Sequence, residues 1–170
     1  MFDLVIRGDT VVTPQAVGAF DIAIAGEKIV AVAASGSLPV PDSARVIDAT
    51  GKIVMPGGID PHVHCKWFLP NPDGSAGLTD PPDVVSKAAV HGGTTTIIDF
   101  TRASQGDNLR DAIEKREADW QGHCACDYAQ HIMVEGALPV DLPPQLAEAI
   151  QAGFPTVKIF TTDITPSRKG

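Results

Sequence analysis

The sequence predicts an α/β fold: the first half of a TIM-like (β/α)8 barrel, preceded by an all-β N-terminal unit. Residues 1–55 hold only short apolar segments separated by turn residues, the pattern of a β-unit. From residue 56 on, β-branched segments alternate with helix-like stretches, which is typical of βα units on a parallel sheet. The 170 residues are too few for a closed eight-stranded barrel, which needs roughly 250.

The N-terminal unit, residues 1–55, is expected to be built from local strand pairings. Residues 20–25 alternate with period two, and a turn at Gly26-Glu27-Lys28 joins them to the next strand as a hairpin. The expected strands of this unit are residues 2–6, 10–13, 20–25, 29–32, 45–49 and 52–54.

The second unit, residues 56–170, is expected to hold the first four βα units of the barrel. Its expected strands are residues 57–64, 94–100, 126–134 and 156–160, and its expected helices are residues 81–91, 107–120 and 142–152. Asp107 is the expected N-cap of the second helix. An open doubly wound sheet is the alternative, but its usual Gly-x-Gly-x-x-Gly turn after the first strand is missing.

Composition limits the classes of function. The net charge of −8 and the absence of a basic run argue against nucleic-acid binding, which depends on Lys and Arg. Residues 1–7 lack a basic stretch followed by a long apolar one, so we expect no signal peptide, and no apolar segment has the roughly 20 residues that a membrane helix needs. Three cysteines, two of them one residue apart, do not form a disulfide framework, so we expect a cytoplasmic protein.

His62 and His64 are the first candidates for chemistry. They end the strand predicted at residues 57–64, and side chains at i and i+2 of a strand point to the same face. Barrel enzymes place their active sites at the carboxyl ends of the strands. Two imidazoles side by side there suit a divalent metal, with zinc as the first choice; the alternative is two polar residues in a loop mouth.

Lys158 is the second candidate, because it lies in the apolar segment of residues 156–160. A buried lysine is unfavourable unless it is paired or neutralised. Carbamylation by CO2 would turn its amine into a carboxylate that can bridge two cations. The alternative is an edge strand on which Lys158 faces water.

Other polar residues have weaker patterns. Asp99 ends the second barrel strand and could support a histidine ligand, or it could be a polar residue at the barrel mouth. Asp60 could bond the loop or orient a ligand. His131 is expected to be a core histidine outside the site, and His91 a helix C-terminal residue. Residues 123–126, His-Cys-Ala-Cys, could bind a soft metal, but a strand start with small buried cysteines is preferred.

Residues 53–64, 92–99 and 157–160 together resemble the dihydropyrimidinase and D-hydantoinase family, cyclic amidohydrolases of the amidohydrolase superfamily. The resemblance runs in order over the whole chain. It implies that His62 and His64 bind the more buried of two divalent metal ions, with zinc expected, and that carboxylated Lys158 bridges both. It also implies that a metal-bridging hydroxide hydrolyses the C–N bond of a cyclic amide such as a hydantoin or a dihydropyrimidine.

The resemblance carries further expectations. Residues 1–55 would be the N-terminal strands of a small β-sandwich domain. Trp67 and Phe68 would lie over the pocket and contact the substrate, and the protein would be a homo-oligomer, a dimer or a tetramer. Two further histidines and a proton-shuttle aspartate would lie beyond Gly170, so the 170 residues alone are expected to be an inactive fragment.

One departure from the family is visible. Hydantoinases have a tyrosine shortly after the bridging lysine, but here Phe160-Thr161-Thr162-Asp163 follows Lys158, and Tyr128 is the only tyrosine. Allantoinase and dihydroorotase are therefore alternatives among enzymes. A non-catalytic scaffold that acts through oligomer contacts is the alternative from another class.

Overall fold

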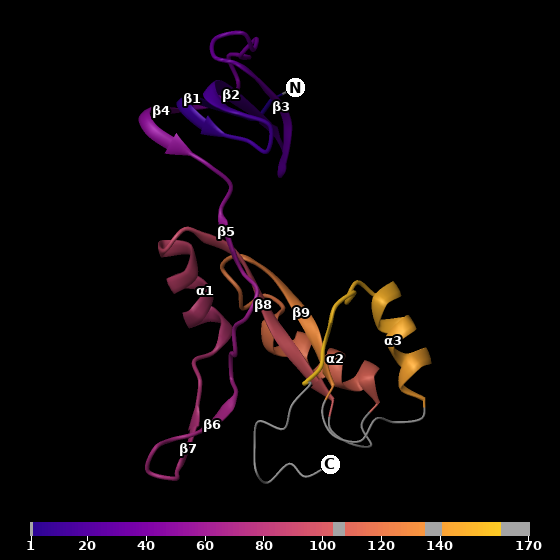
Figure 1. Cartoon of the computed structure of the whole chain (residues 1–170). Helices are drawn as coiled ribbons and strands as arrows, with labels where there is room; N and C mark the ends of the chain where they lie inside the picture. Colours follow the sequence, from indigo (N-terminus) through magenta and orange to yellow (C-terminus); the bar gives the residue numbers. More distant parts are fainter. Residues whose placement is uncertain (1, 104–107, 135–140, 161–170) are drawn as a thin grey trace. The chain divides into compact units, whose positions relative to one another are not determined.

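The structure is a computed structural model that describes residues 2–103, 108–134 and 141–160. The chain divides into two compact units, Met1–Pro56 and Gly57–Gly170. Each unit has its own sheet, and the two units are described in turn (Figure 1).

The first unit is one four-stranded sheet with the order β3-β2-β1-β4. Strands β1 and β2 and strands β2 and β3 pair antiparallel, whereas β1 and β4 pair in parallel. The strands are β1 (Leu4–Val12), β2 (Val17–Ala25), β3 (Lys28–Ala34) and β4 (Arg45–Val54). The predicted hairpin is therefore present as β2 and β3.

Two strands are longer than the sequence predicts. β1 and β4 were each expected as two short strands, and that expectation is wrong because register irregularities near Gly8 let both strands continue. Gly51 takes a positive φ of 72°, which glycine tolerates, and its N–H donates to the Asp9 carboxylate at 2.8 Å. The irregular points of the two strands are thus tied together.

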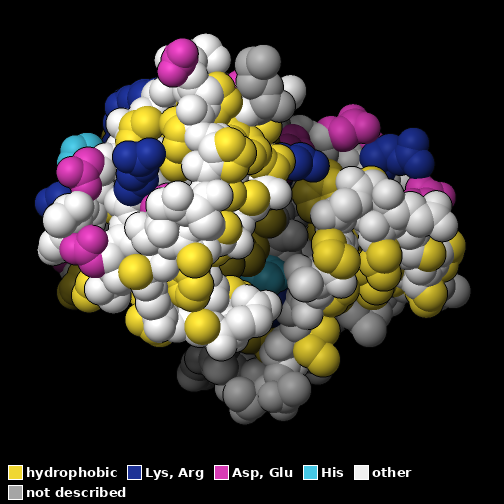
Figure 2. Space-filling model, turned by 90° about the horizontal axis from the view of Figure 1, so that it is seen from above, with side chains coloured by type: hydrophobic (Ala, Val, Ile, Leu, Met, Phe, Trp, Pro, Cys, Tyr) yellow, Lys and Arg dark blue, Asp and Glu magenta, His cyan; other side chains and the backbone are white. Residues whose placement is uncertain are grey.

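The buried side chains of the first unit include Val5, Val11 and Ile22. Asp21 is also fully buried, and its carboxylate accepts the N–H of Gly36 at 2.8 Å. Many apolar side chains stay exposed, and Figure 2 shows hydrophobic groups open over a broad area of one face of the molecule. The exposed large apolar side chains of the first unit are Val17, Ile29, Val30, Val32, Val46, Ile53 and Met55. A β-sandwich needs a second sheet on such a surface, and the sandwich remains a prediction.

The second unit is built on a parallel sheet with the order β10-β9-β8-β5. Its strands are β5 (Gly58–Asp60), β8 (Thr94–Ala103), β9 (Asp127–Val134) and β10 (Val157–Lys158), and a small hairpin of β6 (Phe68–Pro70) and β7 (Ala76–Leu78) follows β5. The helices are α1 (Pro82–His91), α2 (Leu109–Trp120) and α3 (Leu142–Gln151). This βα order is the one predicted for part of a barrel.

The ends of the elements follow local chemistry. β5 stops at Asp60 rather than at His64, because Pro61 has no N–H for the sheet. The expected N-cap Asp107 lies outside the described residues; Asn108 caps α2, and its side chain accepts the N–H of Arg110 at 2.8 Å. Among the described residues, every helix is too short or too polar to cross a lipid bilayer.

The helices pack on one face of this sheet. One apolar cluster joins Ile97 of β8 to Trp120 of α2, with side chains of α1 packed against it. A second cluster joins Ile132 of β9 to Leu109 and Ile113 of α2 and to residues of α3. Since side chains alternate along a strand, Phe100 and its register partner His131 lie on the opposite face. That opposite face carries the candidate site.

Candidate metal centre

His62 and His64 lie directly after β5, and the N–H of Val63 between them still donates to the Ile98 carbonyl of β8 at 3.0 Å. The Asp60 carboxylate accepts the N–H of His62 at 3.0 Å, so Asp60 shapes the loop. The Thr79 hydroxyl donates to the His64 carbonyl at 2.7 Å and fixes the second histidine. Lys158 is the last residue of β10, so all three candidates stand at the carboxyl ends of parallel strands.

Three nitrogen atoms converge at this edge. His62 Nε2 lies 3.2 Å from His64 Nε2, and Lys158 Nζ lies 3.4 Å from His62 Nε2. Two imidazole nitrogens bound to one tetrahedral zinc at about 2.0–2.1 Å would stand about 3.3 Å apart. The spacing of the two histidines therefore fits a shared metal ion.

The ring of Phe100 packs against His62, His64 and Lys158. The sequence pattern did not point to this residue. It is 2% exposed, and its ring centroid lies 4.7 Å from that of His62 and 5.0 Å from that of His64. Lys158 Nζ sits 4.6 Å from the same ring centroid, at cation–π distance. The half-buried Lys158 thus faces the histidines.

Asp99 lies behind His64 and is fully buried. Its Oδ1 accepts the N–H of Phe100 at 2.7 Å and lies 4.0 Å from His64 Nδ1. Burial raises the pKa of Asp99, and the charge of Arg116 opposes that rise. Desolvation lowers the pKa of His64, and the charges of His62, Lys158 and Arg116 lower it further. His64 is thus favoured as the neutral imidazole that a metal requires.

Arg116 of α2 was also missed in the sequence. Its guanidinium donates to the Asp99 carboxylate and, at 2.6 Å, to the Cys65 carbonyl. Its neighbour on the helix, Asp119, accepts from Lys66 Nζ at 2.7 Å, and Lys66 has a positive φ of 51°. Helix α2 therefore binds the segment that follows His64 through Arg116 and Asp119.

His131 has partners at both ring nitrogens, as a satisfied histidine should, but it is half-buried and not a core residue away from the site. The residue lies beside the candidate site, with its ring centroid 5.2 Å from that of Phe100. Its Nδ1 lies 2.6 Å from Thr156 Oγ1 and its Nε2 lies 3.1 Å from the Pro61 carbonyl. Both ring nitrogens are thus engaged, and His131 links β9 to the loop that carries His62.

The remaining candidates lie elsewhere. Cys124 Sγ and Cys126 Sγ are 4.0 Å apart, and within the described ranges no three His, Cys, Asp or Glu side chains gather as a metal site. His91 Nδ1 lies 2.8 Å from the Lys87 carbonyl at the end of α1, as expected. Tyr128 donates to Glu117 of α2, on the helical face of the sheet, and so does not replace the missing tyrosine.

Two aromatic residues follow the histidines. The Trp67 ring centroid lies 4.6 Å from that of His64, so Trp67 adjoins the site. Phe68 is 75% exposed and begins β6. Trp67 is thus next to His64, and Phe68 is open to solvent.

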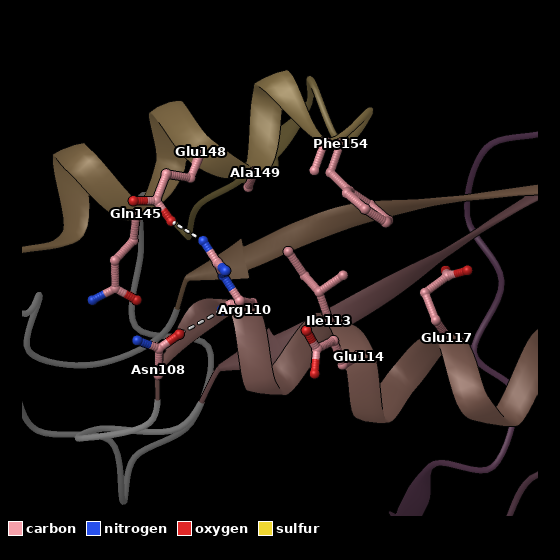
Figure 3. A pocket seen from close by; sticks show the side chains of 10 residues that line it. Asn108, Arg110, Ile113, Glu114, Glu117, Gln145, Glu148, Ala149 and Phe154 are labelled. Carbon is pink, nitrogen blue, oxygen red and sulfur yellow. Dashed lines mark hydrogen bonds and ion pairs between the residues drawn. The ribbon is translucent and has the colours of Figure 1, made fainter.

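A groove of about 470 Å³ lies between α2 and α3. Figure 3 shows Arg110 of α2 reaching Glu148 of α3 across it. The groove belongs to the helical face, because its lining residue Ile113 packs on Ile132. It therefore lies apart from the His62–His64 pair and holds none of the candidate residues.

Comparison with known proteins places this arrangement in context. The chain is 38% identical over 133 residues to a D-hydantoinase of Streptomyces coelicolor, covering 76% of this chain and 27% of that protein. It is 36% identical over 156 residues to a D-hydantoinase of Geobacillus stearothermophilus, and the match covers 91% of this chain and 31% of that protein. The crystal structure of dihydropyrimidinase from Brevibacillus agri superposes with a TM-score of 0.80 at 35% identity. The superposition covers 95% of this chain and 34% of that one. No protein-family model matches the sequence.

These similarities define the fold class of the chain: its described sheets have the fold of part of an amidohydrolase barrel protein. The chain is homologous to the D-hydantoinases and dihydropyrimidinases, and the family resemblance predicted from its motifs is confirmed. The chain spans about a third of the length of the relatives it matches.

Proposed function

We propose that the protein is a metal-dependent hydrolase that opens cyclic amides of the hydantoin and dihydropyrimidine type. One observation carries the proposal: His62 Nε2, His64 Nε2 and Lys158 Nζ converge at the carboxyl ends of β5 and β10. The names of the relatives, D-hydantoinase and dihydropyrimidinase, supply the substrate class.

His62 and His64 would hold one divalent cation, with zinc as the first candidate, through their Nε2 lone pairs. Asp99 faces the other nitrogen of His64 and would keep that ring oriented. A divalent cation at such a site supplies Lewis acidity and lowers the pKa of water toward neutrality.

Lys158 would become a ligand only after reacting with CO2. Its neutral amine would attack the carbon of CO2, so that an N–C bond forms as one C=O π bond opens; the nitrogen would pass one proton to water, and the product would be an anionic carbamate. That carboxylate would bridge the first cation and a second one. Lys158 Nζ lies 4.6 Å from the ring centroid of Phe100 and 5.1 Å from that of Phe160, so the two rings hold the amine within the site.

The substrate ring would lie above the histidines, against Trp67 and Phe68. Trp67 is held by its backbone N–H, which donates to the Thr79 hydroxyl at 2.8 Å. The same hydroxyl binds the His64 carbonyl, so the aromatic contact and the ligand share one support. This position suits selection of the side group of the ring. A homo-oligomer in the cytoplasm completes the proposal.

The experiment is a ring-opening assay of the full-length protein with hydantoin, dihydrouracil, allantoin and dihydroorotate, together with zinc analysis of the same purified protein. Wild-type protein is expected to open hydantoin or dihydrouracil when zinc and bicarbonate are supplied. Lys158→Ala is expected to lose activity and part of its bound zinc. Lys87→Ala, at an exposed lysine of α1, is the matched control and is expected to change neither.

Unchanged zinc content and unchanged turnover in Lys158→Ala would refute the bridging role. Turnover of only allantoin or only dihydroorotate would identify the protein as an allantoinase or a dihydroorotase instead. No turnover of any ring, with no zinc bound by wild type, would favour a non-catalytic scaffold.

A further inference from the structure

We propose that Arg116 is a positioning residue of the metal centre. It holds Asp99 against His64 so that the neutral ring keeps its proton on Nδ1 and presents the Nε2 lone pair to the metal. The inference rests on the proposed metal site at His62 and His64 and adds a residue outside that site to it.

The geometry starts at the guanidinium. Arg116 Nη2 donates to both Asp99 and the Cys65 carbonyl, the latter at 2.6 Å. The Cys65 N–H in turn points to the Asp99 carboxylate at 3.3 Å. A single nitrogen of Arg116 thus fixes the carboxylate and the residue that directly follows His64.

The second step is the direction of Asp99. One carboxylate oxygen is taken by Arg116 and Cys65, and the other accepts the Phe100 N–H and lies 4.0 Å from His64 Nδ1. His64 Nδ1 is buried and makes no hydrogen bond within the described part of the chain. An ionised carboxylate only accepts hydrogen bonds, so it favours an N–H over a lone pair at the nitrogen that faces it.

The third step is that Arg116 is itself held. Its side chain is 12% exposed, its Nη1 lies 3.4 Å from Asp119, and its guanidinium carbon lies 6.0 Å from the Trp120 ring centroid. The rigid planar fork of arginine lets Nη2 serve Asp99 and Cys65 while Nη1 contacts Asp119, which the single nitrogen of a lysine on a flexible stem does poorly. Arg116 therefore transmits the position of α2 to the histidine.

Arg110 is a matched control on the same helix. It also forms an ion pair, with Glu148 at 2.7 Å, but both side chains are more than 60% exposed and neither touches the His64 segment. A change that acts only through helix charge would affect both arginines alike.

The test uses protein labelled with 15N at histidine. The nitrogen shifts of His64 are measured without metal at a pH where the ring is neutral, and zinc affinity is measured separately. In wild type, the shifts are expected to show a protonated Nδ1 and a free Nε2. Arg116→Gln is expected to move both shifts toward tautomer-averaged values and to weaken zinc binding by about 10-fold or more. Arg110→Gln is expected to change neither.

Unaltered His64 shifts and zinc affinity in folded Arg116→Gln would overturn the proposal. If that variant does not fold, Asp99→Asn tests the same link with a side chain of equal size, and wild-type His64 shifts in Asp99→Asn would overturn it equally. The shifts are read without substrate, so they stand or fall separately from hydrolase activity.

Discussion

Replacing Asp99 by alanine should strongly destabilise the second unit. The carboxylate is fully buried and accepts from Arg116 and from the Phe100 N–H. The Asp99→Ala change removes the buried counter-charge of the guanidinium, which is only 12% exposed, and leaves it only the 3.4 Å contact with the partly exposed Asp119. Breaking a buried ion pair from one side costs about 3–5 kcal/mol, because the remaining charge stays desolvated.

Urea denaturation of the metal-free protein measures this loss. Both tryptophans, Trp67 and Trp120, lie in the second unit, so tryptophan fluorescence follows that unit. With an m-value of about 2 kcal/mol/M, the expected loss lowers the midpoint by about 2 M urea. The m-value itself should stay the same.

Glu148→Ala is the control for Asp99→Ala. Its ion pair with Arg110 is exposed, and exposed pairs contribute little because water and salt screen them. The midpoint of Glu148→Ala is expected to match wild type. A midpoint for Asp99→Ala as high as that of Glu148→Ala would show that the buried pair does not hold the unit together.

Three more predictions concern the surroundings of the site. Trp120→Ala removes a fully buried ring and should lower the free energy of unfolding by about 3–5 kcal/mol, as measured by urea titration with circular dichroism. Gly57→Ala would place a Cβ 2.1 Å from Thr95 Oγ1 and should cost about 1–3 kcal/mol in the same titration, more than Gly58→Ala, whose nearest atom is 3.3 Å away. Burial raises the pKa of Cys126 to about 11, so its alkylation, followed by mass spectrometry, should be slow at neutral pH and rise about tenfold per pH unit up to that value.

The sequence predicted the parts of the site that depend on local pattern. His62 and His64 were found from their spacing, and Lys158 from its place in an apolar strand, and the structure brings these three residues together. The order of strands and helices followed from alternation of β-branched and helix-like segments. The parallel sheet of the second unit agrees with it.

The sequence did not predict the groups that arrive from other elements. Arg116 looks like any charged residue of an amphipathic helix, and only the packing of α2 on β8 brings it to Asp99. Phe100 and His131 became neighbours of the histidines through the register of β8 and β9, which no local pattern encodes. The predicted strand ends were wrong for a local reason, because Pro61 stops β5 and irregular pairing near Gly8 lets β1 continue.

The central claim is that His62 and His64 share a metal ion beside Lys158. Crystals of the protein grown with zinc and bicarbonate, measured above and below the zinc absorption edge, test it most directly. The account predicts an anomalous peak about 2.0–2.1 Å from both Nε2 atoms, together with added density on Lys158 Nζ. Zinc density elsewhere, with no peak between the two histidines and an unmodified Lys158, would contradict it.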